Sequence, residues 1–363
     1  MATRWVIGTM TGTSLDALDA SLVRIEGEGV AMRVTLDRHA TTDLGPLRPR
    51  LRAACDGTPM SARDFAALAL DFGRLHADAI GRLAGTRRLD LVAVHGQTVT
   101  HAPPCSWQLV NPWPIALAAR CAVASDLRGA DLAAGGEGAP ITPLADWILF
   151  RDATPTAIVN LGGFCNITWL PSADAGPEGV RGADICPCNH LLDAAAKRHL
   201  GMPFDPDGGH ACRGRADGSR AADLGRALEA AGSDRRSLGS GDEGRDLLQV
   251  LEGLAADDAV ATLASALGSR IGTAASAVGG IGRVVLAGGG ARNRGLGQAI
   301  ASASPGATVI SSAELGVPVE ARESMEMAVL GALAWDGVRI TLPSVTRRGS
   351  AAARDGLWCL PPT

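Results

Sequence analysis

The stretch RWVIGTMTGTSLDALDASLVRI (residues 4–25) predicts a β-hairpin whose two strands flank a polar, glycine-containing turn. Residues 4–10 are apolar and partly β-branched, and residues 20–25 alternate in the manner of a second strand. The segment VAMRVTL (30–36) can pair next to them. The turn carries residue types that suit either an anion-binding site or an ordinary hairpin turn.

A second stretch, PTAIVNLGGFCNITWLP (155–171), predicts the same arrangement of two strands around a glycine turn. Strand and helix patterns then alternate in both halves. Helices are expected at 61–83, 189–200, 257–278 and 323–335, strands at 89–96 and 307–311, and a strand, glycine turn and helix within 282–300. The polar, glycine-rich segment 205–245 is expected to be mobile. We therefore expect two related α/β domains with a cleft between them.

The bulk composition narrows the class of protein. The 363 residues carry a net charge of −4, which argues against a general electrostatic grip on nucleic acid or on an anionic membrane. We find neither an export signal nor a run of about 18 apolar residues. The eight cysteines are scattered, so free thiols are expected rather than a disulfide framework. A cytoplasmic enzyme is the leading class, and a homodimer is left open.

Three glycine-rich turns each follow an expected strand: residues 8–19, Gly162-Gly163 and Gly288 to Gly290. Glycine amides can approach a phosphate closely, and the carboxylates of the first turn can hold a hydrated Mg²⁺. None of the three has the Gly-Lys-Ser/Thr sequence of a Walker loop. A tight turn explains each one alone equally well, but together they fit a nucleotide clamped between two domains.

The segment VHGQTVTHAP (94–103) places His95, Gln97 and Thr98 at the end of an expected buried strand, where α/β proteins usually bind ligands. The glutamine and threonine favour a polyhydroxylated ligand over a metal. A histidine that is merely hydrogen-bonded in the core is the alternative for His95.

The segment GADICPCNHLLDAAAKRHLG (182–201) contains Asp184, the obvious candidate for a catalytic base, just before an expected helix. Its cysteines, Cys186 and Cys188, raise the alternatives of a metal site or a redox pair. Zinc sites usually use pairs spaced Cys-x₂₋₄-Cys, often two of them, and redox pairs use Cys-x-x-Cys. A single Cys-Pro-Cys fits neither pattern well.

With these motifs in hand, the chain resembles the anhydro-N-acetylmuramic acid kinase family. The motifs that carry the resemblance are GTMTGTSLDALDASLV, HGQTVTHAP, WQLVNPWPIA, SDLRGADLAAGGEGAPITP, AIVNLGGFCNITWL, GADICPCNHLLD, FDPDG, VVLAGGGARN and ELGVPVEARESMEMAVLGALAW. They cover nearly the whole chain in order. The resemblance implies an α/β fold of two RNase-H-like domains, as in actin-like ATPases, with an interdomain cleft.

The resemblance also implies the chemistry. Asp184 activates a water that attacks C1 of the 1,6-anhydro bridge, and O6 takes the γ-phosphoryl group of ATP with Mg²⁺. The product is N-acetylmuramic acid 6-phosphate, an intermediate of cell-wall recycling. Phosphoryl transfer depends mainly on positioning and charge neutralisation, while the acetal needs an activated water, so this chemistry suits the residues present.

Other roles follow from position in the family motifs. ATP phosphate is held by Gly12, Thr13, Ser14, Leu15, Asp16, Ala17, Leu18 and Asp19, with Asp16 as the expected Mg²⁺ ligand. The rest of the nucleotide site is formed by Gly162, Gly163, Gly288, Gly289, Gly290 and Asn293. The sugar contacts are His95, Gln97, Thr98, Arg128, Asn166, Asn189 and Glu326.

The expected domains are residues 1–132 with about 340–363, which contain the first turn, and residues 133–339, which contain Asp184 and the nucleoside-binding turn. The family form after the aspartate is Thr-Gly-Pro-Gly-Asn, and here Ile185, Cys186 and Cys188 replace the threonine and the two glycines, while Pro187 and Asn189 keep the family residues. We expect the cysteines to remove positive-φ freedom and to narrow the space above the phosphates.

Three alternatives to the family reaction stay open at this point. One is a kinase of the same fold acting on another anhydrosugar such as levoglucosan. Another is a non-catalytic sensor that binds a nucleotide or a sugar. The last is a metal protein that uses Cys186 and Cys188.

Overall fold

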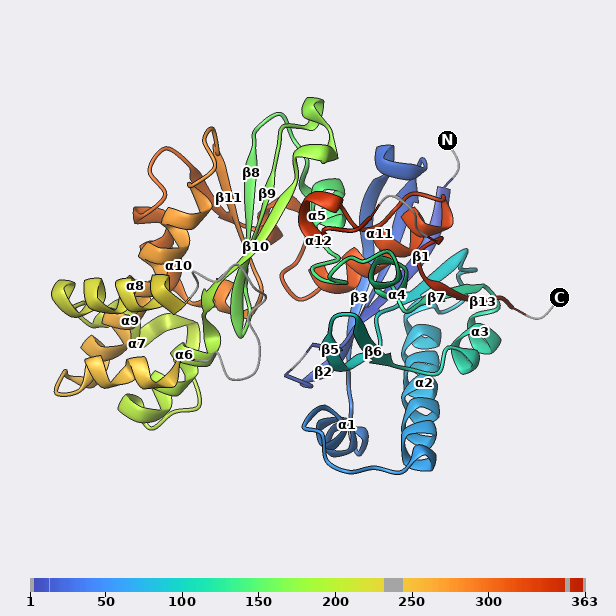
Figure 1. Cartoon of the computed structure of the whole chain (residues 1–363), viewed down its shortest axis with the longest axis horizontal. Helices are drawn as coiled ribbons and strands as arrows, with labels where there is room; N and C mark the ends of the chain where they lie inside the picture. Colours follow the sequence, from blue (N-terminus) through green and yellow to red (C-terminus); the bar gives the residue numbers. More distant parts are fainter. Residues whose placement is uncertain (1–2, 13, 232–243, 350–352, 362–363) are drawn as a thin grey trace. The chain divides into compact units, whose positions relative to one another are not determined.

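The structure is a computed structural model that describes residues 3–12, 14–231, 244–349 and 353–361. The chain divides into two compact units (Figure 1), each of which is described by itself. Unit 1 comprises Met1–Phe150 and Gly316–Thr363, and unit 2 comprises Arg151–Leu315. Thr13, predicted to bind phosphate, lies outside the described residues.

Unit 1 is built on a six-stranded sheet with the order β13-β7-β4-β1-β2-β3. Its strands are β1 (Thr3–Met10), β2 (Ala17–Glu26), β3 (Arg33–Asp43), β4 (Leu91–Val94), β7 (Ala122–Ser125) and β13 (Leu357–Cys359). The first three strands pair antiparallel, as the hairpin pattern predicted. Strand β4 then pairs parallel with β1, and β7 pairs parallel with β4.

Unit 2 repeats this order in a five-stranded sheet, β10-β9-β8-β11-β12. Its strands are β8 (Thr156–Leu161), β9 (Phe164–Leu170), β10 (Arg181–Pro187), β11 (Arg283–Ala287) and β12 (Thr308–Ser311). Again three antiparallel strands are followed by two parallel ones. In both units the third, second, first, fourth and fifth strands stand side by side. The expected fold of two RNase-H-like α/β domains is confirmed.

Helices complete both units. Unit 1 has α1 (Leu47–Cys55), α2 (Ala62–Ala84), α3 (Trp113–Ala119), α4 (Gly129–Ala133), α5 (Pro143–Phe150), α11 (Arg322–Trp335) and α12 (Pro343–Thr346), with a hairpin of β5 (Gln97–Ala102) and β6 (Cys105–Leu109). Unit 2 has α6 (Asn189–Ala195), a π-helical turn at Ala196–Leu200, α7 (Gly209–Arg213), α8 (Gly218–Ala231), α9 (Ala256–Ala275) and α10 (Arg294–Ser302). No described helix is long and apolar enough to cross a membrane.

Local sequence explains where the longest helix begins. The Ser61 side chain accepts a hydrogen bond from the Asp64 amide, and the Asp64 carboxylate accepts one from the Ser61 amide. This capping box satisfies two amides that would otherwise lack partners. Apolar residues such as Leu68, Phe72 and Leu83 then recur on one face and are buried.

The domain boundaries predicted from the sequence are corrected by the structure. Residues 133–150 and 316–339 belong to unit 1 rather than to the second unit. The physical reason is packing, because α11 contacts β1, β2, β4 and α5, all of which lie in unit 1. The segment 205–245, expected to be mobile, contains α7 and α8, and its residues 232–243 lie outside the described part. The cleft between the domains stays a prediction.

Gly8 in β1 lets α11 lie close against the sheet. A Cβ added at Gly8 would be 2.0 Å from the Ser324 carbonyl oxygen and 2.3 Å from the Ala328 amide nitrogen. Both of these atoms belong to the backbone of α11, so neither can move aside cheaply. Gly8 lies in the first glycine motif of the sequence, and its contacts assign it to helix packing.

We expect Gly8→Ala to lower the free energy of unfolding by about 1–3 kcal/mol or more, because it overpacks the contact between α11 and the sheet. Gly81→Ala in α2 is the matched control, since a Cβ there would meet nothing within 4 Å. The control should be neutral or stabilising by up to about 1 kcal/mol. Urea denaturation measures both, and equal stability of the two variants would contradict the assignment.

Candidate active site

In unit 2 the predicted nucleotide-binding turns meet around one side chain, Asn189. Its amide donates to the Gly162 carbonyl oxygen at 3.0 Å, and its side-chain Nδ2 donates to the Leu161 carbonyl oxygen at 3.0 Å. A Cβ added at Gly290 would be 2.7 Å from Asn189 Oδ1. Asn189 thus joins the turn after β8 to the turn after β11, and the parallel pairing of these strands places both turns at one edge of the sheet.

The Asn293 side chain caps the N-terminus of α10. Its Oδ1 accepts a hydrogen bond from the Leu296 amide at 3.0 Å and caps α10. Gly288, with φ +75°, has no room for a side chain, since a Cβ there would be 2.7 Å from Asn160 Oδ1. Gly288 and Gly290 are therefore required by close packing against the protein itself, whereas a Cβ at Gly289 would meet nothing nearer than Asn189 Nδ2 at 3.9 Å.

Asp184 belongs to a row of polar residues that crosses three strands. Asn160 pairs with Asn166, and Asn166 pairs with Asp184, across β8, β9 and β10. Directly opposite residues share a sheet face and lie close to each other. All three are half-buried, whereas the alternate positions Leu161, Cys165 and Ile167 are in the core. The register thus brings the predicted base next to the predicted sugar contact Asn166.

A β-bulge follows Asp184, because the register shifts between Asp184 and Cys186. The extra residue, Ile185, is buried in the core. A bulge re-aims the side chains next to it. Asn160 is the candidate that the sequence analysis missed: it stands in the quoted NLGG motif, but only the strand register shows that it shares a row with Asp184.

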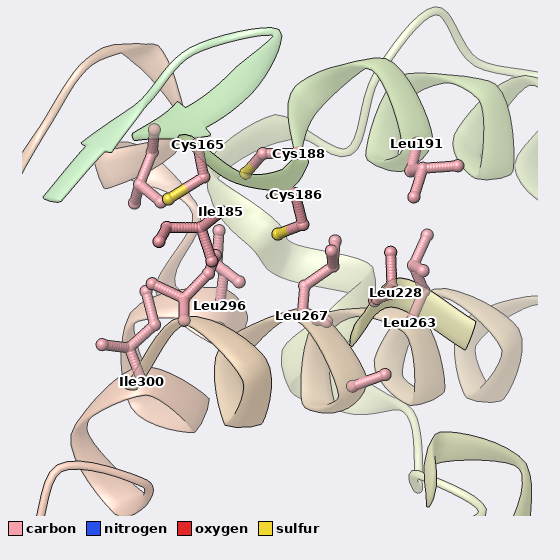
Figure 2. Packing of buried hydrophobic residues seen from close by; sticks show 14 of the residues in the cluster. Cys165, Ile185, Cys186, Cys188, Leu191, Leu228, Leu263, Leu267, Leu296 and Ile300 are labelled. Atoms are coloured by element: carbon pink, nitrogen blue, oxygen red, sulfur yellow. The ribbon is translucent and has the colours of Figure 1, made fainter. Parts of the chain in front are cut away.

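The cysteines of the loop are core residues. Cys165, Cys186 and Cys188 have no exposed surface and pack with leucines of α9 and α10 (Figure 2). Burial raises the pKa of Cys186 to about 12 and the pKa values of Cys165 and Cys188 well above the ordinary value. Among the described residues, no group of three or more histidines, cysteines or carboxylates is arranged to hold a metal ion.

This packing corrects the expectation that the cysteines narrow the space above the phosphates. Cys188 has φ −129°, so it lies outside the positive-φ region that favours glycine. Both side chains point into the core of unit 2 (Figure 2). The loop itself is held by backbone hydrogen bonds from Cys188 and Asn189 to the carbonyl oxygens of Gly163 and Gly162.

In unit 1 the first turn joins β1 to β2. Two arginines of α1 donate hydrogen bonds to its backbone carbonyl oxygens. Arg52 Nη2 donates to the Ser14 carbonyl oxygen at 2.6 Å, and Arg48 Nη2 donates to the Asp16 carbonyl oxygen at 2.5 Å. Leu15 has φ +57°, and its side chain is fully buried. Ser14 and Asp16 are exposed, so the turn presents a hydroxyl and a carboxylate outward.

The remaining residues of this motif lie in β2. Leu18 is fully buried, and Ala17 pairs with Asp43 of β3. The Asp19 carboxylate accepts a hydrogen bond from Thr41 Oγ1 at 2.7 Å and lies 3.3 Å from His39 Nε2. Leu15 and Leu18 can therefore offer a ligand only their backbone, and Asp19 is already engaged by β3.

His95 and Arg128 meet in unit 1. His95 follows β4, and Arg128 follows β7, which is parallel to β4. The Arg128 Nη2 atom donates to His95 Nε2 at 3.0 Å, and Nη1 donates to the Gly138 carbonyl oxygen at 2.8 Å. Burial, and then the Arg128 charge, lower the pKa of His95 to about 3, so the ring is neutral at physiological pH.

Several buried polar atoms near this edge lack a hydrogen-bond partner. They are Thr11 Oγ1, Gln97 Oε1 and Arg128 Nε. The Gln97 side-chain nitrogen is 3.6 Å from Cys55 Sγ and donates to the Thr98 carbonyl oxygen at 3.3 Å. Buried polar groups are normally satisfied by protein, water or a ligand. The arrangement is thus suited to binding a polar ligand.

Glu326, the last predicted sugar contact, lies in a buried cluster of charges. It has no exposed surface, and Arg322 Nε approaches its Oε1 at 2.8 Å. The same guanidinium donates twice to Asp146 Oδ1, at 3.1 and 2.6 Å, which leaves Glu326 without a hydrogen bond of good geometry. Burial raises the pKa of Glu326 well above its usual range, although Arg322 opposes the shift. The sequence analysis did not single out Arg322 or Asp146.

The sequence-predicted residues therefore form two groups, one in each unit. A model of the anhydro-N-acetylmuramic acid kinase family matches residues 4–355. The chain belongs to the anhydro-N-acetylmuramic acid kinase family. This confirms the resemblance inferred from the motifs and the class of enzyme, a phosphotransferase.

Two curated relatives carry that family name. The anhydro-N-acetylmuramic acid kinase of Salinibacter ruber is 33% identical over 386 residues, which cover 98% of this chain and 96% of the relative. The one of Streptomyces coelicolor is 37% identical over 369 residues, covering 95% and 92%. A solved structure, the activator of the 2-hydroxyisocaproyl-CoA dehydratase from Clostridium difficile with bound ADPNP, covers 90% of this chain and 94% of its own at 15% identity and a TM-score of 0.45.

We expect thiol labelling to separate the cysteines by burial. Cys105 and Cys212 are exposed, and Cys55 is half-buried. In the native protein, a disulfide reagent such as DTNB should modify the two exposed thiols fast and Cys55 more slowly. The five buried thiols should react only after unfolding in guanidinium, because burial keeps them protonated and inaccessible. Removing Cys105 and Cys212 by serine substitution should abolish the fast phase. A persistent fast phase from Cys186 or Cys188 would contradict the packing.

Acid should destabilise the protein through its buried neutral histidines. Burial lowers the pKa of His76 to about 4, and its Nδ1 is 2.9 Å from the Phe72 carbonyl oxygen. Between pH ~6.5 and ~4, the unfolded chain binds a proton at this position and the folded chain does not. Stability is therefore lost as pH falls, by up to about 1.4 kcal/mol per pH unit for each such histidine.

His76→Gln removes one of these titrating groups and should show a smaller fall in Tm from pH 7.5 to pH 5 than the unsubstituted protein. Calorimetry at the two pH values measures the difference. Equal falls in Tm would show that His76 does not take up its proton on unfolding.

Proposed function

We propose that the protein is an ATP-dependent kinase that opens the 1,6-anhydro ring of anhydro-N-acetylmuramic acid with water and phosphorylates O6. The product is N-acetylmuramic acid 6-phosphate. The observation that carries the proposal is the family match over residues 4–355, within which Asp184 stands half-buried in the polar row of unit 2. We place the reaction in the cytoplasm, where ATP is available, as a step of cell-wall recycling.

In this proposal Asp184 accepts a proton from the attacking water. The water oxygen bonds to C1 as the bond from C1 to O6 breaks. O6 then bonds to the γ-phosphorus of ATP, and ADP leaves. One proton is released overall, and it passes through Asp184 to solvent. This role is supported because a carboxylate that is held beside a water molecule can act as the general base for its attack.

The nucleotide is assigned to two sets of residues. We assign the phosphates to the first turn and the nucleoside to Gly288 to Gly290. The space beside Gly289, where an added Cβ would meet nothing nearer than Asn189 Nδ2 at 3.9 Å, and the turn at Gly162-Gly163 support binding through amides. Mg²⁺ would neutralise phosphate charge, with the exposed Asp16 holding the hydrated ion and the phosphates supplying further oxygens.

The residues proposed to recognise the sugar are Gln97, Thr98, Arg128, Asn166, Asn189 and Glu326, with His95 beside Arg128. The unpartnered Gln97 Oε1 supports a hydroxyl or amide contact. Arg128 is the cation among these residues, and anhydro-N-acetylmuramic acid is an anion through its lactyl carboxylate. A guanidinium and a carboxylate form strong charge-assisted hydrogen bonds.

We expect Asp184→Asn to lower kcat by about 10²–10⁴-fold with little change in the KM for ATP, because the amide cannot take the water proton. Asp174→Asn is the control, since Asp174 is an exposed carboxylate of the same unit and should leave kcat unchanged. ADP release measures the rate. Mass spectrometry in H₂¹⁸O should find one ¹⁸O in the phosphorylated sugar.

Two results would overturn the proposal. One is near-normal turnover of anhydro-N-acetylmuramic acid by Asp184→Asn. The other is a substrate panel in which levoglucosan or an open sugar is preferred by kcat/KM. ATP binding without ADP release on any sugar would instead support a non-catalytic sensor.

A further inference from the structure

Arg128 differs from Arg322 and Arg348, which are ion-paired with carboxylates, in having no carboxylate within hydrogen-bond distance. Within the described residues it forms no ion pair, and its guanidinium donates to the Gly138 carbonyl oxygen and to His95 Nε2. Its Nε is buried and unpartnered. A buried charge is costly unless something neutral or anionic solvates it. His95 supplies one of the two fixed acceptors.

The hydrogen bonds fix which nitrogen of His95 carries its proton. Nδ1 lies 2.9 Å from the Gly96 carbonyl oxygen, which can only accept, so Nδ1 carries the hydrogen. Nε2 then carries no hydrogen in the neutral ring, and it accepts a hydrogen bond from Arg128 Nη2 at 3.0 Å. A protonated ring would set a second donor and a second positive charge against the guanidinium. The backbone hydrogen bond from the His95 amide to the Thr9 carbonyl oxygen, at 3.2 Å, ties this residue to β1.

Two nearby carboxylates, Asp126 and Asp131, act on Arg128 through their charge and partly offset the burial that lowers the pKa of Arg128 to about 10, but neither forms an ion pair with it. Asp131 is fully buried, and its carboxylate accepts from Thr341 Oγ1, Thr346 Oγ1 and the Gly138 amide. Asp126 Oδ1 accepts from the Gly129 amide at 3.0 Å. His101, the remaining titratable neighbour of His95, has its pKa lowered by burial and by Arg128. Arg128 is thus held in place while its positive charge stays available to an anion.

We propose that His95 is a positioning residue that acts through Arg128, rather than a residue that contacts the sugar itself. The inference rests on the proposed function, in which Arg128 binds the carboxylate of the sugar. His95 then contributes only to recognition of the acidic group. It is 3% exposed, and both of its ring nitrogens are already used, so it has no polar atom left for a ligand.

Kinetics on two sugars tests the inference. Anhydro-N-acetylmuramic acid carries the lactyl carboxylate, and 1,6-anhydro-N-acetylglucosamine lacks it. His95→Leu cannot accept from Arg128, and we expect its KM for the acidic sugar to rise about 10–100-fold with the KM for ATP unchanged. Its kcat/KM for the neutral sugar should change less than threefold. His95→Gln keeps an acceptor oxygen and should stay within a few-fold of the unsubstituted protein on both sugars.

The control for losing a buried histidine is His76→Leu, which also lies in unit 1 but does not contact Arg128. It should lower Tm and leave the preference for the acidic sugar intact. An equal loss on both sugars in His95→Leu would overturn the inference. So would a His95→Gln variant as impaired as His95→Leu, since that result would mean that the imidazole itself touches the sugar.

A measurement independent of activity separates this inference from the proposed function. The ¹⁵N side-chain resonances of His95 should report a neutral ring with hydrogen on Nδ1 from pH 5 to pH 8. In Arg128→Gln, His95 should titrate at a higher pH, because the neighbouring charge is gone. If the protein phosphorylates neither sugar, the proposed function fails, and a ring that is protonated or has the other tautomer would overturn the inference in its own right.

Discussion

In each unit, the first strand of the sheet pairs in parallel with the fourth, and this constraint decides where the polar residues gather. Parallel strands end at the same edge of a sheet, whereas antiparallel strands end at opposite edges. The turn after β1 therefore lies at the same edge as the residues after β4 and β7, and the turn after β8 lies at the same edge as the turn after β11. Residues far apart in the chain are brought together by strand order alone.

Much of this fold could be predicted from local sequence. The β-branched runs around Gly12 and Gly162 predicted both hairpins, and the capping box at Ser61 predicted the start of α2. Strand β10 was missed because RGADICP does not alternate and contains both a glycine and a proline. The domain boundary was misplaced because α11 packs on β1, and no local pattern encodes a contact across about 300 residues.

The site could be predicted as a set of residues but not as a set of contacts. The motifs selected both His95 and Arg128, yet only the parallel pairing of β4 with β7 shows that they contact each other. The motifs drew attention to Cys186 and Cys188, yet their direction depends on a β-bulge and on the packing of α9. Direction of a side chain across a sheet is set by register, and a one-residue shift reverses it.

The partners of the buried arginines in unit 1 distinguish arginines that stabilise the fold from one that can bind a ligand. Arg322 is balanced by Asp146 and Glu326, and Arg348 by Asp355 at 2.7 Å. An arginine paired in this way has no net attraction left for a ligand, and breaking the pair would leave a buried charge uncompensated. Arg128 instead has a neutral imidazole and a carbonyl oxygen as its acceptors. These acceptors solvate the guanidinium without cancelling its charge, which supports the proposal that an anionic ligand binds there. The charge of the partner, and not the degree of burial, therefore supports the proposal that Arg128 binds an acidic sugar.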